Sequence, residues 1–405
     1  MKNCSKEGVD VISFGCRLNA AESEIIKQNA EKMGLRNVVI VNTCAVTAEA
    51  ERQAGQAIRR LKKERPDARI IVTGCSSEIN PDKYKAMEEV EEIIGNLDKL
   101  KYGSNISIKR PEQAEMQRAF IEVQNGCDNR CTFCIIPYGR GKSRSVSFET
   151  VSRKMAELAE HGYKEVVITG IDIASYGKDL PGEPALGYML KRVLKENPGI
   201  ERVRLSSLDP CGMDEDLWDL IKEEQRFMPH LHLSIQSGDN LILKRMGRRH
   251  TREDILRLTK RARKLRPDIV FGADIIAGFP TESEEAFRNS VELVESSGIT
   301  WLHVFKYSAR KGTPAAKMPQ VDIGIRKERA KILQDVGKRN TDIYNESLLG
   351  KEFKVLAEKN GIGCTPHFGK VKIEGATQQN VGKIVKVRAK GIEKGILIVQ
   401  NIENI

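Results

Sequence analysis

Three closely spaced cysteines have the clearest chemical potential in this sequence. They lie in the segment Gln124-Asn125-Gly126-Cys127-Asp128-Asn129-Arg130-Cys131-Thr132-Phe133-Cys134. Thiolates at this spacing on one loop can wrap one face of a cubane cluster, and iron–sulfur clusters are held mainly by cysteine thiolates. Three ligands for four irons leave one iron open, where a small molecule with an amino and a carboxylate group could chelate. The spacing therefore predicts an iron–sulfur site at Cys127, Cys131 and Cys134.

Three further cysteines are far apart in the sequence but hold equivalent places. Cys16, Cys44 and Cys75 each follow an apolar run that is typical of a β-strand. In open parallel sheets ligands bind beyond the carboxyl ends of the strands, so we expect these thiols to converge. Taken singly, each could be a buried apolar residue, because cysteine is often interior. Three in register, each flanked by Gly or Thr, favour a second three-cysteine cluster site.

Zinc and inert thiols are the alternatives to iron–sulfur clusters. Structural zinc requires four protein ligands, and no fourth Cys or His lies close to the first triad in the sequence. Cys4, Cys211 and Cys364 stand alone and are assigned no chemistry. None of the six histidines makes a metal-like pair with another ligand residue. His230 and His232 bracket a strand, which predicts ordinary packing or surface roles.

Composition indicates a globular protein with a polyanionic partner. The 405 residues allow two or three domains, and 40% hydrophobic with 30% charged residues argue against disorder. The start has no apolar leader, and no uninterrupted apolar run approaches the length of a membrane span, so we expect a cytoplasmic protein with no membrane partner. Nine cysteines in a reducing compartment point to metal or catalysis before disulfides. The net charge of +11 suits RNA.

The elements that must position the second triad lie in the first hundred residues. Apolar runs at 9–14, 38–41 and 69–72 alternate with helical patterns that begin near Ala20, span 48–63 and begin again near Asp82. Such alternation predicts an open parallel α/β sheet with helices on its faces, over residues 1–103. The polar stretch from 104 to 117 is typical of a linker.

The first triad belongs to a second domain, predicted over residues 118–345. Six strand candidates follow one another at the spacing of β/α units, at 119–124, 165–169, 202–206, 230–235, 269–275 and 302–307. Six units are too few to close an eight-stranded barrel, so we expect an open, partial (β/α)6 barrel. A charged helical pattern follows, over about 321–349.

The last segment, residues 347–405, reads as a small β-barrel. Short β-branched runs lie at 353–357, 369–373, 384–389 and 395–399, with an irregular stretch at 360–368. The segment holds ten Lys and Arg against five Glu and no Asp, which suits contacts with RNA phosphates. Because it shares no predicted strand with the other domains, we expect that a deletion from Ser347 would leave them folded.

The first triad has the cysteine spacing of the radical S-adenosylmethionine superfamily, which this chain resembles. With the second triad, the resemblance narrows to the methylthiotransferase family and covers nearly the whole chain, as a cluster domain, a radical domain and a TRAM domain. The other matching segments are Cys134–Gly141, Thr169–Gly177, Leu233–Gly238, Arg245–Arg249, Asp274–Pro280 and Phe305–Pro314.

The resemblance implies two [4Fe–4S] clusters and S-adenosylmethionine as cofactor. The cofactor would chelate the open iron at the first triad and be cleaved reductively to a 5′-deoxyadenosyl radical, and it would also donate the methyl group. In the family an aromatic residue at the place of Phe133 borders the cofactor's adenine. Gly170, Ser206, Gln236 and Gly278 fall at the ends of barrel strands, where we expect the cofactor's ribose and carboxylate, although turns and polar caps would also explain them.

The substrate branch also follows from resemblance. The segments Gly15–Asn19 and Tyr307–Arg310 look most like the branch that converts N6-threonylcarbamoyladenosine next to the tRNA anticodon (adenosine 37) to its 2-methylthio derivative. The alternatives are the branch acting on N6-isopentenyladenosine, the branch acting on an aspartate of a ribosomal protein and, from a different class, a non-catalytic RNA-binding protein with zinc or inert thiols.

The implied partners are the anticodon stem-loop of tRNA and an electron-donor protein such as a flavodoxin or ferredoxin. For contacts with the RNA we expect the basic loop with Arg140, Lys142 and Arg144, and Arg310. The alternative for this loop is an ordinary solvated surface.

Overall fold

The computed structural model describes residues 8–96, 98–99, 114 and 117–402, with Arg17 described by its backbone alone. Almost all of the predicted linker at 104–117, and Cys4, lie outside these residues. The chain forms two compact units. The first contains the N-terminal sheet together with residues 125–143 and 308–317, and the second contains the central strands and the C-terminal barrel. No helix in the described ranges is both long enough and apolar enough to cross a membrane.

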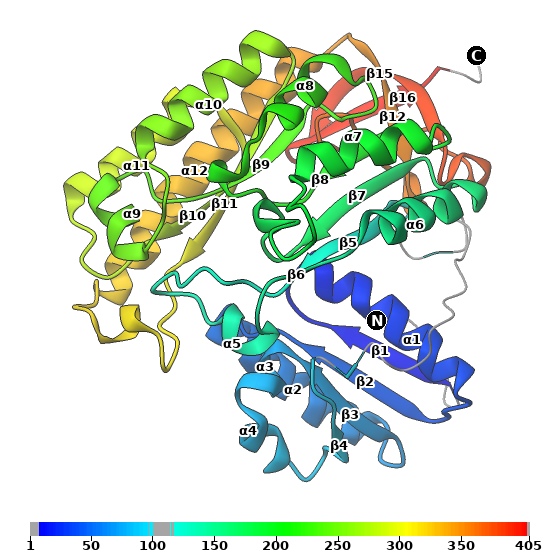
Figure 1. Cartoon of the computed structure of the whole chain (residues 1–405), viewed down its shortest axis with the longest axis vertical. Helices are drawn as coiled ribbons and strands as arrows, with labels where there is room; N and C mark the ends of the chain where they lie inside the picture. The colour runs from blue at the N-terminus through cyan, green and yellow to red at the C-terminus, as the bar shows by residue number, and fades with distance from the viewer. Residues whose placement is uncertain (1–7, 97, 100–113, 115–116, 403–405) are drawn as a thin grey trace. The chain divides into compact units, whose positions relative to one another are not determined.

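The first unit is built on a parallel sheet with the strand order β1-β2-β3-β4 (Figure 1). The strands are β1 (Val9–Ser13), β2 (Val38–Thr43), β3 (Arg69–Gly74) and β4 (Glu92–Ile93). The helices are α1 (Arg17–Lys32), α2 (Ala48–Glu64), α3 (Cys75–Ile79), α4 (Pro81–Lys85) and α5 (Ile136–Arg140). The prediction of an open parallel α/β sheet is confirmed. The helix predicted from about Asp82 is α4, and the short α3 occupies the loop that the sequence predicts before it. The two stay separate because Pro81 lacks the N–H that a continuing α3 would need.

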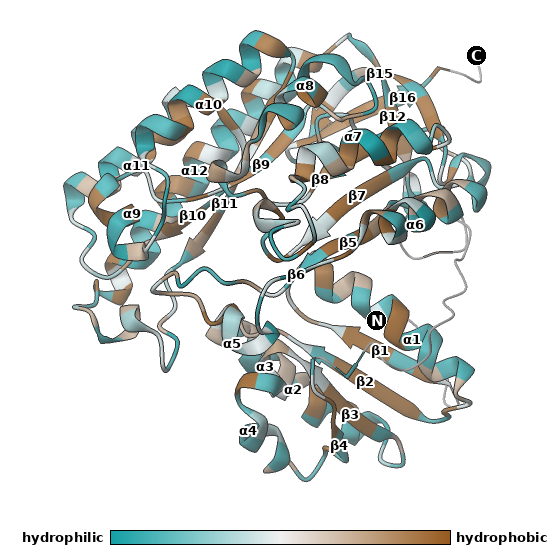
Figure 2. Cartoon of the chain, in the orientation of Figure 1, coloured by the Kyte–Doolittle hydropathy of each residue, from teal (hydrophilic) through white to brown (hydrophobic). Residues whose placement is uncertain are grey.

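Both faces of this sheet are covered, which explains why β2 is buried throughout and why its residues 38–41 are all apolar. Successive side chains of a strand point to opposite faces. Val39 and Val41 pack with Ile58 of α2, whereas Val38 and Ile40 pack with Ile26 of α1. Burying one such side chain contributes about 1.5–3 kcal/mol. The strands accordingly appear brown in Figure 2, while the helices around them are mixed in colour.

The second unit contains the predicted partial barrel. Its strands are β5 (Ala119–Asn125), β6 (Arg144–Ser145), β7 (Glu165–Gly170), β8 (Arg202–Leu205), β9 (His230–Gln236), β10 (Val270–Ala277) and β11 (Ile299–Lys306). Its helices are α6 (Phe148–Glu160), α7 (Leu186–Glu196), α8 (Glu215–Glu223), α9 (Asn240–Met246), α10 (Arg252–Leu265), α11 (Glu284–Ser296) and α12 (Ile323–Leu348). Strands β5, β7 and β8 pair in parallel, as do β9, β10 and β11. A parallel bridge between Leu208 and Leu233 connects the two groups, which gives the six-stranded order that the sequence predicts.

The C-terminal strands close into a barrel with the order β12-β13-β14-β16-β15. They are β12 (Glu352–Ala357), β13 (Ile362–Cys364), β14 (Lys370–Glu374), β15 (Ile384–Glu393) and β16 (Ile396–Asn401). The barrel is filled by alternate residues such as Val371, Val385 and Val399. A TRAM-like barrel is thus confirmed. β13 lies in the stretch that looked irregular, because three residues with a central glycine carry no readable alternation.

The loop between β13 and β14, here called the plug loop (residues 365–369), packs against the amino-terminal ends of the central strands. Arg204 of β8 is 1% exposed and donates hydrogen bonds to the backbone oxygens of Thr365 and Pro366, both at 2.6 Å. Phe368 stacks on His230 of β9, with ring centroids 4.9 Å apart. A deletion from Ser347 would remove these acceptors of buried arginine N–H groups, so these contacts argue against the expectation that it would leave the central domain intact.

Candidate metal centres and cofactor site

The structure brings Cys16, Cys44 and Cys75 together at the carboxyl edge of the N-terminal sheet. Cys16 is the N-cap of α1, three residues after the end of β1, Cys44 follows β2, and Cys75 opens α3 directly after β3. The thiols are near enough to affect one another's ionisation, since Cys16 and Cys75 both contribute to the pKa of Cys44. The three residues thus form one group, as their equivalent places in the sequence suggest.

Two glycines allow the cysteine-bearing turns to come this close. Gly15 has φ +94°, and a Cβ on it would collide with the Cys44 thiol. Gly74 has φ +102°, and a Cβ on it would collide with the backbone of Thr43. A side chain at either position would be strained, and one at Gly15 would also fill the space beside the Cys44 sulfur.

A buried arginine from the segment after the first triad lies beside these thiols. Arg140 is 3% exposed and its Nε lies 3.2 Å from the Cys75 Sγ. Its two terminal nitrogens donate to the Glu22 carboxylate at 2.7 and 2.9 Å, and Nη2 also donates to Asn19 Oδ1 at 2.6 Å. Lys99 Nζ donates to Glu22 at 2.6 Å. Arg140 and Lys99 carry two positive charges and Glu22 carries one negative charge, so a net positive charge lies next to the sulfur atoms.

This placement corrects the expectation for Arg140. A side chain that is enclosed in an ion-pair network cannot reach an RNA phosphate. Its partner Glu22 is ionised, because although burial raises its pKa, the hydrogen bonds and charges of Arg140 and Lys99 lower it further than burial raises it. Glu22 is therefore committed to these cations and is not a fourth metal ligand.

The thiols themselves are set up for a metal rather than for free thiolates. Burial raises the pKa of Cys44 to about 11. Cys16 reaches solvent on one side, yet the protein that surrounds the rest of it raises its pKa as well. Binding to a metal deprotonates coordinating thiols and supplies the missing positive charge. Three sulfur donors, a cradle kept open by Gly15 and a neighbouring cation fit an anionic three-thiolate cluster.

The first triad lies on the loop between β5 and α5, and the loop is held by backbone contacts. Gly126 has φ +76°, and a Cβ on it would collide with the backbone of Lys142. Cys127 N donates to Gly141 O at 3.1 Å, and Cys134 N donates to Cys131 O at 3.0 Å. All three cysteines are half-buried. The basic loop thus positions the cysteines through its backbone, while the side chains of Lys142 and Arg144 are exposed.

The four residues predicted to contact the cofactor lie at the carboxyl ends of four successive strands of the second unit. Gly170 ends β7, Ser206 follows β8, Gln236 ends β9 and Gly278 follows β10. The Ser206 hydroxyl oxygen is buried and has no hydrogen-bond partner among the described residues. Gln236 has φ +70°, a conformation that costs a non-glycine residue about 1–3 kcal/mol. An orphaned hydroxyl and a strained glutamine at the expected place fit a polar ligand, and Phe133 lies half-buried on the cysteine loop of the first unit.

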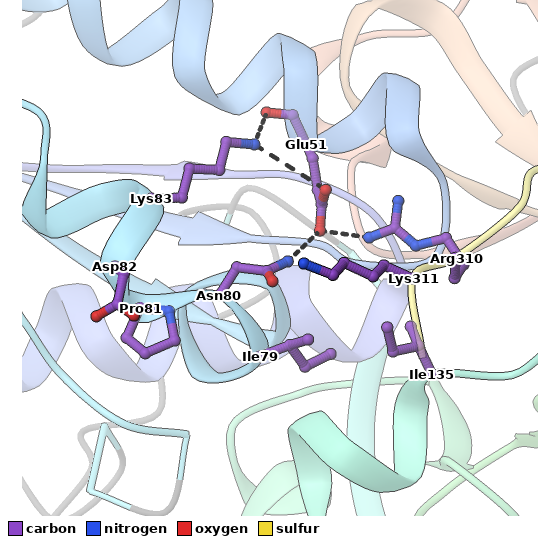
Figure 3. A pocket seen from close by; sticks show the side chains of 9 residues that line it. All are labelled: Glu51, Ile79, Asn80, Pro81, Asp82, Lys83, Ile135, Arg310 and Lys311. Carbon is purple, nitrogen blue, oxygen red and sulfur yellow. Dashed lines mark hydrogen bonds and ion pairs between the residues drawn. The ribbon is translucent and has the colours of Figure 1, made fainter. Parts of the chain in front are cut away.

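A cavity of about 440 Å³ opens in the first unit beside α3 and α4 (Figure 3). Glu51 of α2 lines this cavity and accepts hydrogen bonds from Arg310 and, at 3.4 Å, from Asn80. Lys83 Nζ lies 4.0 Å from the same carboxylate. Arg310 is 6% exposed, so the expectation that it contacts RNA is also corrected. Arg310 thereby connects the segment 308–317 to α2. The Ala48 N–H also donates a hydrogen bond to the Ser308 hydroxyl, at 3.3 Å.

The expectation that no histidine pairs with another ligand residue is wrong. His232 on β9, Asp274 on β10 and His303 on β11 form a group whose ligand atoms all lie within 4.8 Å of one another. Their sequence positions are 29 to 71 residues apart, and only the order and register of the three strands unite them. In the sequence, the one signal for this group is that each of the three residues lies inside a predicted strand. That signal does not show which strands are neighbours in the sheet.

Comparison with known proteins shows which families and relatives the chain matches. Residues 8–95 match the uncharacterized protein family UPF0004, and residues 121–294 match the radical SAM superfamily. The threonylcarbamoyladenosine tRNA methylthiotransferase MtaB of Rickettsia prowazekii is 48% identical over 96% of both chains. MtaB of Aquifex aeolicus is 35% identical over 93% of this chain and 98% of its own.

More distant likenesses extend the comparison. A tRNA-2-methylthio-N(6)-dimethylallyladenosine synthase of Staphylococcus aureus is 34% identical over 93% of this chain and 81% of its own. Among solved structures, the radical S-adenosylmethionine methyltransferase TsrM from Kitasatospora setae, with cobalamin and a [4Fe-4S] cluster bound, matches 77% of this chain and 74% of its own, with a TM-score of 0.54 at 15% identity. At that identity the likeness concerns the fold alone.

Proposed function

The chain belongs to the radical S-adenosylmethionine methylthiotransferase family, and we propose that it converts N6-threonylcarbamoyladenosine of tRNA to its 2-methylthio derivative. The observation that carries this proposal is the 48% identity, over nearly the full length of both chains, with a relative named for that substrate. The proposal requires two metal centres and a radical domain in one chain, and the two cysteine groups and the six-stranded partial barrel provide candidates for all three.

Each cysteine triad would hold one [4Fe–4S] cluster. Cys127, Cys131 and Cys134 would bind the cluster that leaves one iron open to S-adenosylmethionine, and Cys16, Cys44 and Cys75 would bind the second. When bound, these groups supply reductive cleavage of S-adenosylmethionine and the sulfur that enters the substrate. The protein contributes fixed ligands, and Arg140 places a positive charge beside the second site in a buried setting, where it interacts strongly with an anionic cluster.

The cofactor would lie at the carboxyl ends of β7 to β10. The unpartnered Ser206 hydroxyl would bind a polar group of the cofactor, and Gln236 would be kept in its strained conformation by contact with it. At Gly170 a Cβ would lie 2.5 Å from the backbone oxygen of Gln124, so the strand end stays open only without a side chain. These residues would bind and orient the cofactor, and none of them is assigned a proton transfer.

The RNA would be bound in part by basic side chains on two surfaces. Lys142 and Arg144 are exposed beside the first triad. On the C-terminal barrel, alternation places Lys370 and Lys372 of β14 outward while Val371 and Ile373 fill the interior. Lysine and arginine contacts to phosphate provide affinity without base specificity. The anticodon stem-loop is the expected part of the tRNA, a flavodoxin or ferredoxin the expected electron donor, and the cytoplasm the expected compartment.

Nucleoside mass spectrometry of tRNA from cells that lack this protein tests the proposal. We expect loss of 2-methylthio-N6-threonylcarbamoyladenosine, accumulation of the unthiolated nucleoside, and restoration by the wild-type gene but not by a gene encoding Cys131→Ala. Loss of the methylthio form of N6-dimethylallyladenosine instead would mean that the chain acts on the substrate for which the Staphylococcus aureus relative is named. If both nucleosides were unchanged, a missing methylthio group on a ribosomal-protein aspartate would decide for the protein-modifying branch.

A further inference from the structure

The His232–Asp274–His303 group lies on the inner face of the partial barrel. In β9 the alternate residues Leu231, Leu233 and Ile235 belong to the hydrophobic core, as do Ala273 and Ile275 of β10. Because side chains alternate along a strand, His232 and Asp274 point to the opposite, inner face. His232 and Gln236 lie four residues apart on one strand, and so do Asp274 and Gly278. The group therefore lies about 13 Å along the strands, at ~3.3 Å per residue, from the proposed cofactor contacts.

The three side chains hold one another in place through a single oxygen atom. Asp274 Oδ1 lies 2.9 Å from His232 Nε2 and 3.3 Å from His303 Nδ1. Its other oxygen lies 3.5 Å from the Ser207 hydroxyl, which in turn lies 2.8 Å from the Ser234 hydroxyl. Burial raises the pKa of Asp274, but the hydrogen bonds and charges of the two histidines hold it well below its usual range. The carboxylate thus orients both imidazole rings, which lie 4.9 Å apart.

This group is not part of the packed core. The side chain of His303 is 52% exposed, that of Asp274 20% and that of His232 12%. A Cβ on Gly272 would lie 2.5 Å from His232 Nδ1, so the absence of a side chain there gives the ring its place against β10. Toward the amino-terminal ends of the strands, His230 lies between His232 and the plug-loop residue Phe368. The exposed group therefore lies between the closed end of the inner face and the proposed cofactor contacts.

We propose that this triad binds the N6-substituted adenine of the tRNA substrate. The proposal rests on the function proposed above. His303 Nε2, which does not face Asp274 and belongs to the most exposed side chain of the group, can donate or accept a hydrogen bond. His232 Nδ1 instead lies against Gly272. A substituted adenine offers ring nitrogens and substituent oxygens as partners, and a base that undergoes chemistry in a protein is typically read by such bonds and by ring stacking. The exposed ring of His303 supplies the hydrogen bond, and the two oriented imidazoles supply a surface for stacking. His232 and His303 would touch the base, and Asp274 is a positioning residue.

Binding of two synthetic anticodon stem-loops tests the proposal, one with N6-threonylcarbamoyladenosine and one with unmodified adenosine. The proteins are the cluster-loaded wild type and the variants His232→Phe, His303→Phe and Asp274→Asn, with His161→Phe, directly after α6, as the matched histidine control. We expect each triad variant to weaken binding of the modified stem-loop on the order of tenfold, as for the loss of one or two hydrogen bonds. The control should bind as the wild type does, and the salt dependence should not change, because no phosphate contact is lost.

The other outcomes overturn the proposal. Unchanged affinity would show that the triad does not touch the RNA, and a shallower salt slope in the histidine variants would indicate a phosphate site. A stoichiometric divalent metal that is lost in these variants, while the cluster iron is retained, would make the group a metal site. A variant that loses iron or melts early is replaced by His232→Gln or His303→Gln. Turnover of the modified stem-loop by the wild type tests the proposed function separately, since its absence refutes that function whatever the variants show.

Discussion

Replacing Arg204 by methionine tests whether the plug loop stabilises the central barrel. Arg204 donates to Glu165 at 2.7 Å as well as to the backbone oxygens of Thr365 and Pro366. The Glu165 side chain is fully buried, and without Arg204 its nearest cation is Arg202 at 3.5 Å. Removing one partner of a buried pair costs about 3–5 kcal/mol, because the other charge is left uncompensated. At roughly 2 °C per kcal/mol for a unit of this size, the melting transition of the second unit should fall by about 6–10 °C.

The pH dependence of this loss is a second measurement on the same variant. Burial raises the pKa of Glu165, but the charges and hydrogen bonds of Arg204 and its neighbours lower it below 4.5 overall. A carboxyl with a depressed folded pKa contributes stability above its unfolded pKa and loses it as the pH falls through the folded value. The difference between wild type and Arg204→Met should therefore be largest near neutral pH and shrink below about pH 4.

Thermal unfolding and urea unfolding, both followed by circular dichroism at several pH values, measure the two effects. The matched control is Arg261→Met, which removes an exposed arginine paired with Glu215 and should leave the unfolding free energy unchanged. A loss in Arg204→Met no larger than that of the control would refute the reasoning, and would mean that the plug loop does not stabilise the central strands through this residue.

Three further predictions concern the metal centres and the RNA. Alanine at Cys127, Cys131 and Cys134 should remove about half of the iron, measured by elemental analysis, and abolish cleavage of S-adenosylmethionine; full iron retention would contradict that site. Alanine at Cys16, Cys44 and Cys75 should likewise remove about half of the iron but abolish only the methylthiolated product, so loss of both activities in a well-folded protein would argue against separate roles. Alanine at Lys142 and Arg144 should reduce the slope of log affinity against log salt for tRNA by about one per residue, and an unchanged slope would exclude phosphate contacts there.

The cysteine spacing and the alternation of strands and helices could be predicted from the sequence because both are local. The three cysteines of the first triad lie within eight residues of one loop. The period of apolar residues revealed the strands of the N-terminal sheet and of the central barrel, since each strand must bury a face by itself. The convergence of Cys16, Cys44 and Cys75 also followed, because parallel strands share the edge at which they end.

The partners of the buried polar side chains depended on the tertiary structure. Arg140 and Arg310 look like surface cations in the sequence, and they turn inward because Glu22 and Glu51, more than 100 residues away, are buried with them. The same holds for Arg204 and the plug loop, and for the triad of His232, Asp274 and His303. Apolar burial is non-directional and leaves a local period, whereas a hydrogen bond or ion pair requires one partner at one distance. The chain meets that partner only when strand order and register are complete.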